Sequence, residues 1–347
     1  LHLCDRRQRQ MCIRDSYYLK WEKVVEYASE VLGSAPSTVM RDWAAVKQLA
    51  WDGSVRTLDY ISVGHSFNLL MIPMVTGNGS LFNAWSNSGA RFTHNYRVAK
   101  RETYRAKRPM GGPWDRWKDN CIEKVYQHPP FIWQDNDVNK IYMPKWPNQW
   151  EVTDPVTGVG IGRSTMVAFT TNETVLSRAE AYVHLKEYDK AVADLNAWIG
   201  SFYLVGQNGI ESLTRERIAE VYGDPSSDRY IAEYTALEPT SRKPLHPHGF
   251  TVEAGEQEHL IQTTLFCRRI ETIADGLRWG DIKRYGIVID RFDDSAYNDD
   301  NTTGFTVAAT LGEKDLRRAL QLPQEVITAG LEANPRNENR PDHPFCQ

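Results

Sequence analysis

The stretch from Asn172 to Asn196, NETVLSRAEAYVHLKEYDKAVADLN, decides the fold of this chain. Thr170 and Glu173 have the spacing of a capping box, in which side chains satisfy the free N–H groups at the start of a helix. Apolar and aromatic residues then recur every three or four positions, at Ala179, Tyr182, Leu185, Tyr188, Ala191 and Leu195. This spacing predicts two helices, about 171–185 and 189–198, that face each other across the turn near Tyr188.

The same spacing is typical of a tetratricopeptide hairpin, in which small residues let two helices approach closely. The chain shows one recognisable copy of this pattern within 171–198. Because one hairpin cannot bury its apolar stripe alone, further helix pairs are expected. The segment 17–50 predicts such a pair, with a first helix from Tyr17 that ends at Gly33 and a second helix that Thr38 caps.

Helical spacing also appears at Glu211–Tyr222 and Glu256–Ala274, and a short helix is expected within Leu316–Leu331. The segment 51–165 differs, because Pro, Gly and Asn recur every few residues and forbid long helices. We therefore predict an all-α fold of tetratricopeptide-like helical hairpins, an α/α superhelix, with a large irregular, loop-rich capping subdomain at 51–165.

Composition narrows the classes of function. The 347 residues include 41 Lys and Arg against 45 Asp and Glu, a formal net charge of −4. Without a concentrated basic face, nucleic acid is not an expected partner. The sequence has no run of about 18 apolar residues, which argues against a spanning helix. The five cysteines are Cys4, Cys12, Cys121, Cys267 and Cys346, and their spacing predicts neither a metal site nor a disulfide framework.

The first 16 residues, LHLCDRRQRQMCIRDS, are unlike a signal peptide because they contain no apolar core region. They resemble a translated sequencing adaptor joined to a truncated reading frame. We therefore treat 1–16 as a non-native tail and expect the native amino terminus to be missing.

Three segments together resemble the SusD/RagB family of surface glycan-binding lipoproteins. The stretch Cys267–Gly286, CRRIETIADGLRWGDIKRYG, is similar to the family signature near the carboxyl terminus, with matches listed as Arg268, Glu271, Gly276, Arg278, Trp279, Asp281, Ile282, Lys283 and Arg284. Asn172–Asn196 looks like the family's R-A-E-A-Y hairpin, and Leu322-Pro323-Gln324 with Asn334-Pro335 looks like its closing segment. In this sequence, Cys267 stands where an acid is usual, Asp275 replaces Glu and Gly280 replaces an aromatic residue.

The resemblance assigns 166–347 to the family's C-terminal region and makes 17–50 part of its N-terminal region. It implies a non-enzymatic receptor, lipid-anchored on the outer face of the outer membrane, that passes oligosaccharide or polysaccharide to a SusC-like TonB-dependent transporter. The membrane contact would be the lipid anchor, which is absent from this chain. No cofactor and no metal site are predicted from the sequence, although a loose Ca²⁺ contact stays open.

The signature also has a physical interpretation. Arg268 and Glu271 lie three residues apart, the spacing of an ion pair on one helix face. Asp281 lies between Arg278 and Arg284, so we expect a buried network of charge-assisted bonds around Trp279. Such a network fixes how helices dock, and we interpret it as structural and not catalytic.

The segment 51–165 holds the candidate ligand-binding residues. Sugar rings present an apolar face that aromatic rings match and a rim of hydroxyl groups that amides can bind. The candidates combine these two kinds of side chain: Asn83, Trp85, Asn87, Trp114, Trp117, Trp133, Trp146, Asn148 and Trp150. Each tryptophan could instead belong to the core of an irregular subdomain.

Two other functions stay open. A helical glycoside hydrolase would need two carboxylates about 5–10 Å apart, and Asp135, Asp137 and Asp154 lie near the tryptophans. A plain tetratricopeptide scaffold would present a concave surface to a peptide. The order Asp135-x-Asp137-x-Asn139 opens like a calcium loop, but Lys140 and Trp146 occupy the positions where an EF-hand needs Gly and Glu.

Overall fold

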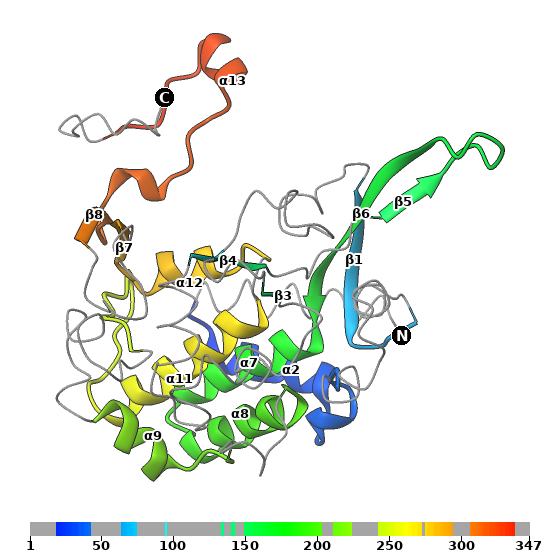
Figure 1. Cartoon of the computed structure of the whole chain (residues 1–347). Coiled ribbons are helices and arrows are strands. Elements are labelled where there is room, and N and C mark those ends of the chain that lie inside the picture. Colours follow the sequence, from blue (N-terminus) through cyan, green and yellow to red (C-terminus); the bar gives the residue numbers. More distant parts are fainter. Residues whose placement is uncertain are drawn as a thin grey trace.

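The computed structural model describes residues 19–42, 64–74, 94–95, 133–134, 140–142, 149–202, 211–223, 242–272, 275–293 and 306–336. Its main body is a layer of packed helices at the base, from which strands extend upward (Figure 1). The helix-rich character expected from the sequence is confirmed.

The predicted hairpin at 171–198 is present. Helix α7 (Thr171–His184) begins where Thr170 caps it, the hydroxyl accepting the Glu173 N–H at 3.1 Å. Helix α8 (Tyr188–Phe202) returns antiparallel to it and is one turn longer than the sequence predicts. Between them Lys186 adopts φ 61°, a left-handed conformation that ends α7.

Helix α7 is the centre of the helical layer, because almost all of its residues are buried. Helices α2 (Trp21–Leu32), α8 and α11 (Glu256–Glu271) pack against it, and α9 (Arg215–Tyr222) packs on α11 (Figure 1). Their shared core contains Ala28, Leu32, Val175, Leu176, Ala179, Leu195, Trp198, Tyr222, Leu260, Ile261 and Cys267. Burial of these side chains supplies the main favourable free energy of the layer.

A buried ion pair joins three of these helices. The Arg178 guanidinium of α7 donates to both carboxylate oxygens of Asp194 in α8, at 2.8 and 2.7 Å. It also reaches the Ser29 hydroxyl at 3.2 Å and the Gly33 carbonyl at 3.5 Å, at the end of α2. Because breaking such a pair leaves a buried charge uncompensated, Arg178 fixes the position of α2 and α8 together.

The chain also contains strands, so the prediction of an all-α fold was too narrow. The long strand β6 (Gly160–Thr170) runs directly into α7 and pairs antiparallel with β1 (Asn68–Met74) and β5 (Gln149–Val152). Short strands β2 (His94–Asn95), β3 (Trp133–Gln134) and β4 (Lys140–Tyr142) form a second sheet. Strands β7 (Ile289–Asp293) and β8 (Thr306–Leu311) form a third.

Several predicted boundaries change. The first helix begins at Trp21 and not at Tyr17, and it ends before Gly33 as expected. Pro36–Thr38 form a single 3₁₀ turn (η1), and no helix begins at Thr38 within the described residues up to Asp42. Helix α9 starts at Arg215 instead of Glu211, because Thr214 caps it, and α11 ends at Glu271 instead of Ala274.

In the C-terminal part, the short helix predicted within Leu316–Leu331 is present, whereas the strands β7 and β8 were not predicted. Helix α12 (Arg278–Arg284) is followed by β7 and β8, the 3₁₀ turn η6 (Leu316–Arg318) and helix α13 (Gln324–Thr328). Arg318 anchors η6, because its guanidinium donates to the carbonyls of Ile282 at 2.9 Å and Ile287 at 2.5 Å.

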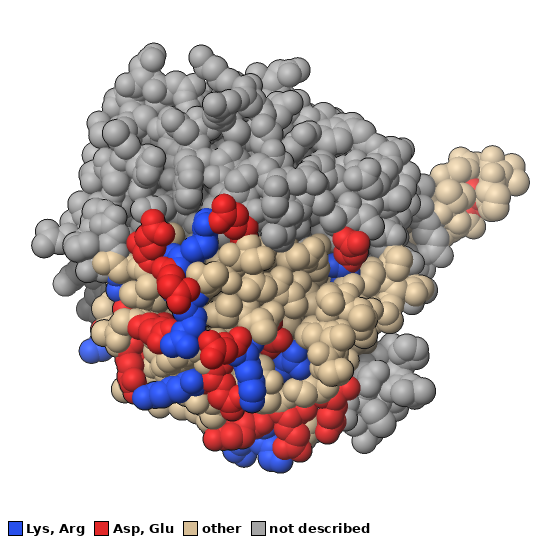
Figure 2. All heavy atoms as spheres, turned by 90° about the horizontal axis from the view of Figure 1, so that it is seen from below, with Lys and Arg blue, Asp and Glu red and all other residues tan. Residues whose placement is uncertain are grey.

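The described surface of the helical layer mixes both signs of charge. Figure 2, which views the layer from below, shows acidic and basic side chains side by side. Many form exposed ion pairs, such as Arg215 with Glu256 and Lys186 with Glu253. None of the helices in the described ranges is long and apolar enough to cross a membrane. The tail 1–16 lies outside the described residues.

Candidate functional site

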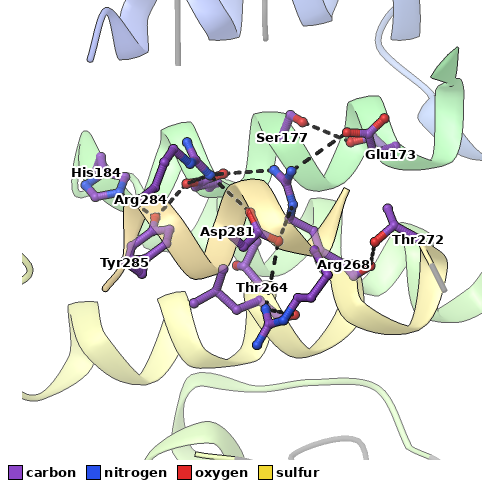
Figure 3. A network of polar contacts seen from close by, with 12 residues as sticks. Glu173, Ser177, His184, Thr264, Arg268, Thr272, Asp281, Arg284 and Tyr285 are labelled. Carbon is purple, nitrogen blue, oxygen red and sulfur yellow. Dashed lines mark hydrogen bonds and ion pairs between the residues drawn. The ribbon is translucent and has the colours of Figure 1, made fainter. Parts of the chain in front are cut away.

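Residues of the signature stretch meet the central helix at a buried cluster around Glu180 (Figure 3). The Glu180 carboxylate of α7, whose side chain is 1% exposed, accepts from Arg268 of α11 at 3.0 Å. Arg284 of α12 donates to both of its oxygens, at 2.7 and 3.0 Å. The Tyr285 hydroxyl donates to Glu180 Oε1 at 2.6 Å. One carboxylate therefore joins three helices.

Asp281 is the second anion of the cluster. Its carboxylate, 2% exposed, lies 3.4 Å from Arg268 Nε, 3.8 Å from Arg278 Nη1 and 3.4 Å from Arg284 Nη2. Glu173 of α7 lies 3.7 Å from Arg268 Nη2. We call Glu173, Glu180, Arg268, Arg278, Asp281 and Arg284 the acid–arginine cluster. The expected buried network around Asp281 is thus present.

The cluster differs from the sequence prediction in two ways. Arg268 pairs with Glu173, Glu180 and Asp281, and it does not form the predicted pair with Glu271. Glu271 instead accepts the indole N–H of Trp198 at 2.9 Å. The network centres on Glu180, which spacing did not single out, whereas Trp279 is a half-buried residue in α12. Gly276 precedes α12 with φ +77°, a backbone conformation that favours glycine.

The electrostatics indicate that this cluster stabilises the packing of the helices. Burial alone raises the pKa of Glu180, but Arg284 and Arg268, with smaller contributions from His184 and the Tyr285 hydroxyl, lower it to about 2. Burial, with the nearby Glu180 charge, raises the pKa of Tyr285 well above its ordinary value. An ionised carboxylate saturated with donors and closed to solvent cannot exchange protons with a substrate. The interpretation of the signature as structural fits this geometry.

A ring cluster at the end of α7 was not predicted. The rings of Trp21 and His184 stack with centroids 4.0 Å apart, and Phe250 meets both edge-on. His184 Nε2 lies 3.1 Å from the Tyr285 hydroxyl oxygen (Figure 3). These residues lie on four segments far apart in the chain, so no spacing rule connects them. Cys267 is buried in the core, and burial raises the pKa of its thiol, which makes it unreactive.

The structure describes two of the aromatic candidates for ligand binding. Trp133 lies in β3 opposite Tyr142 of β4, and Trp150 lies in β5 opposite Gly162 of β6. The other candidates lie outside the described residues: Asn83, Trp85, Asn87, Trp114, Trp117, Trp146 and Asn148. The ligand-binding role of these nine residues stays a prediction.

Asp154 is the one carboxylate of the hydrolase hypothesis that the structure describes, since Asp135 and Asp137 lie outside the described residues. It lies in the turn between β5 and β6 and accepts from the Thr157 hydroxyl at 2.6 Å and the Val156 N–H at 2.9 Å. These bonds lower the pKa of Asp154. A glycosidase acid needs the opposite, a raised pKa. In the described part of the chain no group of three His, Cys, Asp or Glu residues could hold a metal ion.

Comparisons with known proteins found no matching family model, no matching curated protein and no matching solved structure.

Proposed function

We propose that this chain is a non-catalytic receptor of the SusD/RagB type. It binds an oligosaccharide or polysaccharide at the cell surface and delivers it to a SusC-like TonB-dependent transporter in the outer membrane. The single observation that carries the proposal is the order and spacing of the three resembling segments, Asn172–Asn196, Cys267–Gly286 and Leu322–Pro335.

The acid–arginine cluster supports this proposal. Glu173 and Glu180 come from the first resembling segment, and Arg268, Arg278, Asp281 and Arg284 come from the second. Burying charges is costly unless each one meets a partner. Because the buried charges of the two segments pair with one another, the two segments pack as one unit. A family signature that contains both segments requires such joint packing. We propose in addition that the helical layer is a tetratricopeptide-like superhelix.

The proposed binding surface is the aromatic segment 51–165, which contains seven tryptophans combined with Asn and Gln. The helical layer supports the proposal indirectly, because the charges of its acid–arginine cluster pair with one another and its aromatic residues Trp198, Tyr222 and Tyr285 are fully buried. These three rings therefore offer no open face to a glycan. We also propose that a lipid anchor holds the receptor on the outer face of the outer membrane.

Affinity electrophoresis in gels that contain single polysaccharides tests this function. We expect the chain to be retarded by at least one glycan without releasing reducing sugar from it. Trp85→Ala or Trp150→Ala should weaken binding by about 1–3 kcal/mol, which corresponds to about 5- to 150-fold in Kd. Lys190→Ala is the control, because Lys190 is exposed on α8, far in sequence from the aromatic segment.

Three outcomes would contradict the proposal. Release of reducing sugar would favour a glycoside hydrolase. Retardation by no glycan would remove the evidence for a receptor. Unchanged retardation of the Trp85→Ala, Trp150→Ala double variant would place the binding surface outside these two residues.

A further inference from the structure

The ring cluster at the end of α7 joins four separate segments. Trp21 is the first residue of α2, His184 is the last residue of α7, Phe250 precedes α11 and Tyr285 follows α12. The Trp21 and His184 planes are almost parallel, at 7°. The Phe250 ring lies 5.4 Å from His184 and 5.3 Å from Tyr285, in both cases edge to face. His184 is therefore the ring on which the start of α2 rests.

The hydrogen bonds determine where His184 carries its proton. The Tyr285 hydroxyl donates its single proton to Glu180 Oε1 at 2.6 Å, and Glu180 is ionised and cannot donate in return. The hydroxyl oxygen can then only accept from His184 Nε2, at 3.1 Å. The neutral ring consequently carries its proton on Nε2, and a second proton would have to bind at Nδ1.

The charges around His184 are already balanced. Three carboxylates, Glu173, Glu180 and Asp281, face three guanidinium groups, Arg268, Arg278 and Arg284, among the described residues. The charged groups that affect the pKa of His184 are Glu180 from its own helix, which raises it, and Arg284 from α12, which lowers it. Segment 242–255 and α2 contribute the uncharged rings of Phe250 and Trp21.

A proton on Nδ1 would add a positive charge that this balanced cluster does not neutralise. Burial and the nearby Arg284 disfavour the charged ring more than Glu180 favours it, so the pKa of His184 lies below its ordinary value of 6.5. The folded chain thus retains the neutral ring at pH values where the unfolded chain has already taken up a proton. The folded chain therefore loses stability as the pH falls below about 6.5.

We propose that His184 forms an acid-sensitive contact between α7 and α2. Its protonation opens the stack with Trp21 and detaches the first turn of α2 from α7. The opening is local. The remainder of α2 is held by buried Val24, Ala28 and Leu32 and by the bonds from Arg178 to Ser29 and Gly33. This inference does not depend on glycan binding.

Hydrogen exchange of the whole chain, measured by mass spectrometry at about pH 5.5 and about pH 7.5, tests whether the His184–Trp21 contact is acid-sensitive. Exchange times are scaled for the intrinsic pH dependence of amide exchange. The amides of residues 24–28 donate to the carbonyls of residues 20–24, which include the first turn of α2. We expect peptides that contain these amides to lose protection several-fold at the lower pH, while peptides from α8 do not change. His184→Gln retains an N–H donor for Tyr285 but cannot gain a proton, so its α2 protection should be the same at both pH values.

The proposal is wrong if wild-type α2 is equally protected at both pH values, or if the pH response persists in His184→Gln. A titration of the wild-type chain gives a second criterion that needs no variant. The loss of protection should have its midpoint below 6.5, the ordinary pKa of histidine. A midpoint near 4, in the range of ordinary carboxylates, would assign the change to an acid and overturn the proposal.

Discussion

The substitution Glu180→Gln tests the acid–arginine cluster most directly. Gln retains the shape of the side chain but removes the charge that faces Arg268 and Arg284. The pKa of Glu180 falls from an ordinary 4.5 to about 2 in the folded chain. At about 1.4 kcal/mol for each pH unit, this fall corresponds to about 3 kcal/mol of stability at neutral pH. Loss of a buried partner typically costs about 3–5 kcal/mol, which agrees.

The pH dependence provides a sharper test than the magnitude. Because the folded pKa of Glu180 is depressed, its contribution is complete above 4.5 and is lost as the pH falls from 4.5 towards 2. The wild-type chain and Glu180→Gln should therefore differ by about 3 kcal/mol at pH 7 and converge in acid.

The assay is urea unfolding followed by the helical circular dichroism signal, repeated from neutral pH down to about pH 3. Glu253→Gln is the control, since this exposed carboxylate forms an ion pair with the exposed Lys186, and such surface pairs contribute little. Equal stability of Glu180→Gln and the wild-type chain at neutral pH, or a constant difference at every pH, would refute the electrostatic account.

Two backbone predictions follow. Gly286→Ala should lower the free energy of unfolding by about 3 kcal/mol in urea titrations, because φ is +58° and a Cβ would lie 2.0 Å from the carbonyl oxygen of His246. Gly276→Ala, with φ +77° and no atom within 4 Å of the added Cβ, is the matched control and should cost only about 1 kcal/mol. A similar loss in both would disprove the close approach at Gly286. Lys186→Gly should raise the melting temperature by about 2 °C, because glycine relieves the left-handed φ of 61°. Unchanged or lower melting, measured by circular dichroism, would show that its pair with Glu253 outweighs this strain.

The sequence predicted those parts of the fold that depend on neighbouring residues. The start of α7 follows from Thr170 and Glu173, whose capping bond needs only a separation of three positions. The hairpin follows from the spacing of Ala179, Leu195 and similar residues, which places them on facing sides of two helices. The clustering of Asp281 with Arg278 and Arg284 follows in the same way, from one helical turn.

The sequence did not predict features that depend on distant segments. Gly160 and Gly162 lie in a region interpreted as irregular, yet β6 forms there because β5 and β1 supply backbone partners. Strand β1 lies about ninety residues earlier in the chain, so its pairing leaves no local pattern. The prediction that Thr38 caps a helix was wrong, because its hydroxyl donates to the Ala35 carbonyl at 2.7 Å within the 3₁₀ turn.

The same reasoning explains why Glu180 was missed as the centre of the cluster. In sequence it is one acid on a helix whose small and aromatic residues were the evident pattern. Its role appears only when α11 and α12 bring Arg268 and Arg284 to it across 88 and 104 positions. The Trp21–His184 stack was missed for the same reason, because its two rings are separated by almost the whole N-terminal half of the chain.

The Glu180 carboxylate already accepts hydrogen bonds from the protein, which limits where in this chain a ligand can bind. Arg268, Arg284 and Tyr285 all direct donors at Glu180, so a sugar hydroxyl could bind there only by displacing a charge-assisted bond and exposing a buried ion. That exchange is unfavourable for any neutral ligand. The residues that fix the fold and the residues that would bind a glycan must then be different ones. We therefore expect Glu180→Gln to loosen the helical layer whatever the ligand, while the proposed function places glycan binding in the aromatic segment.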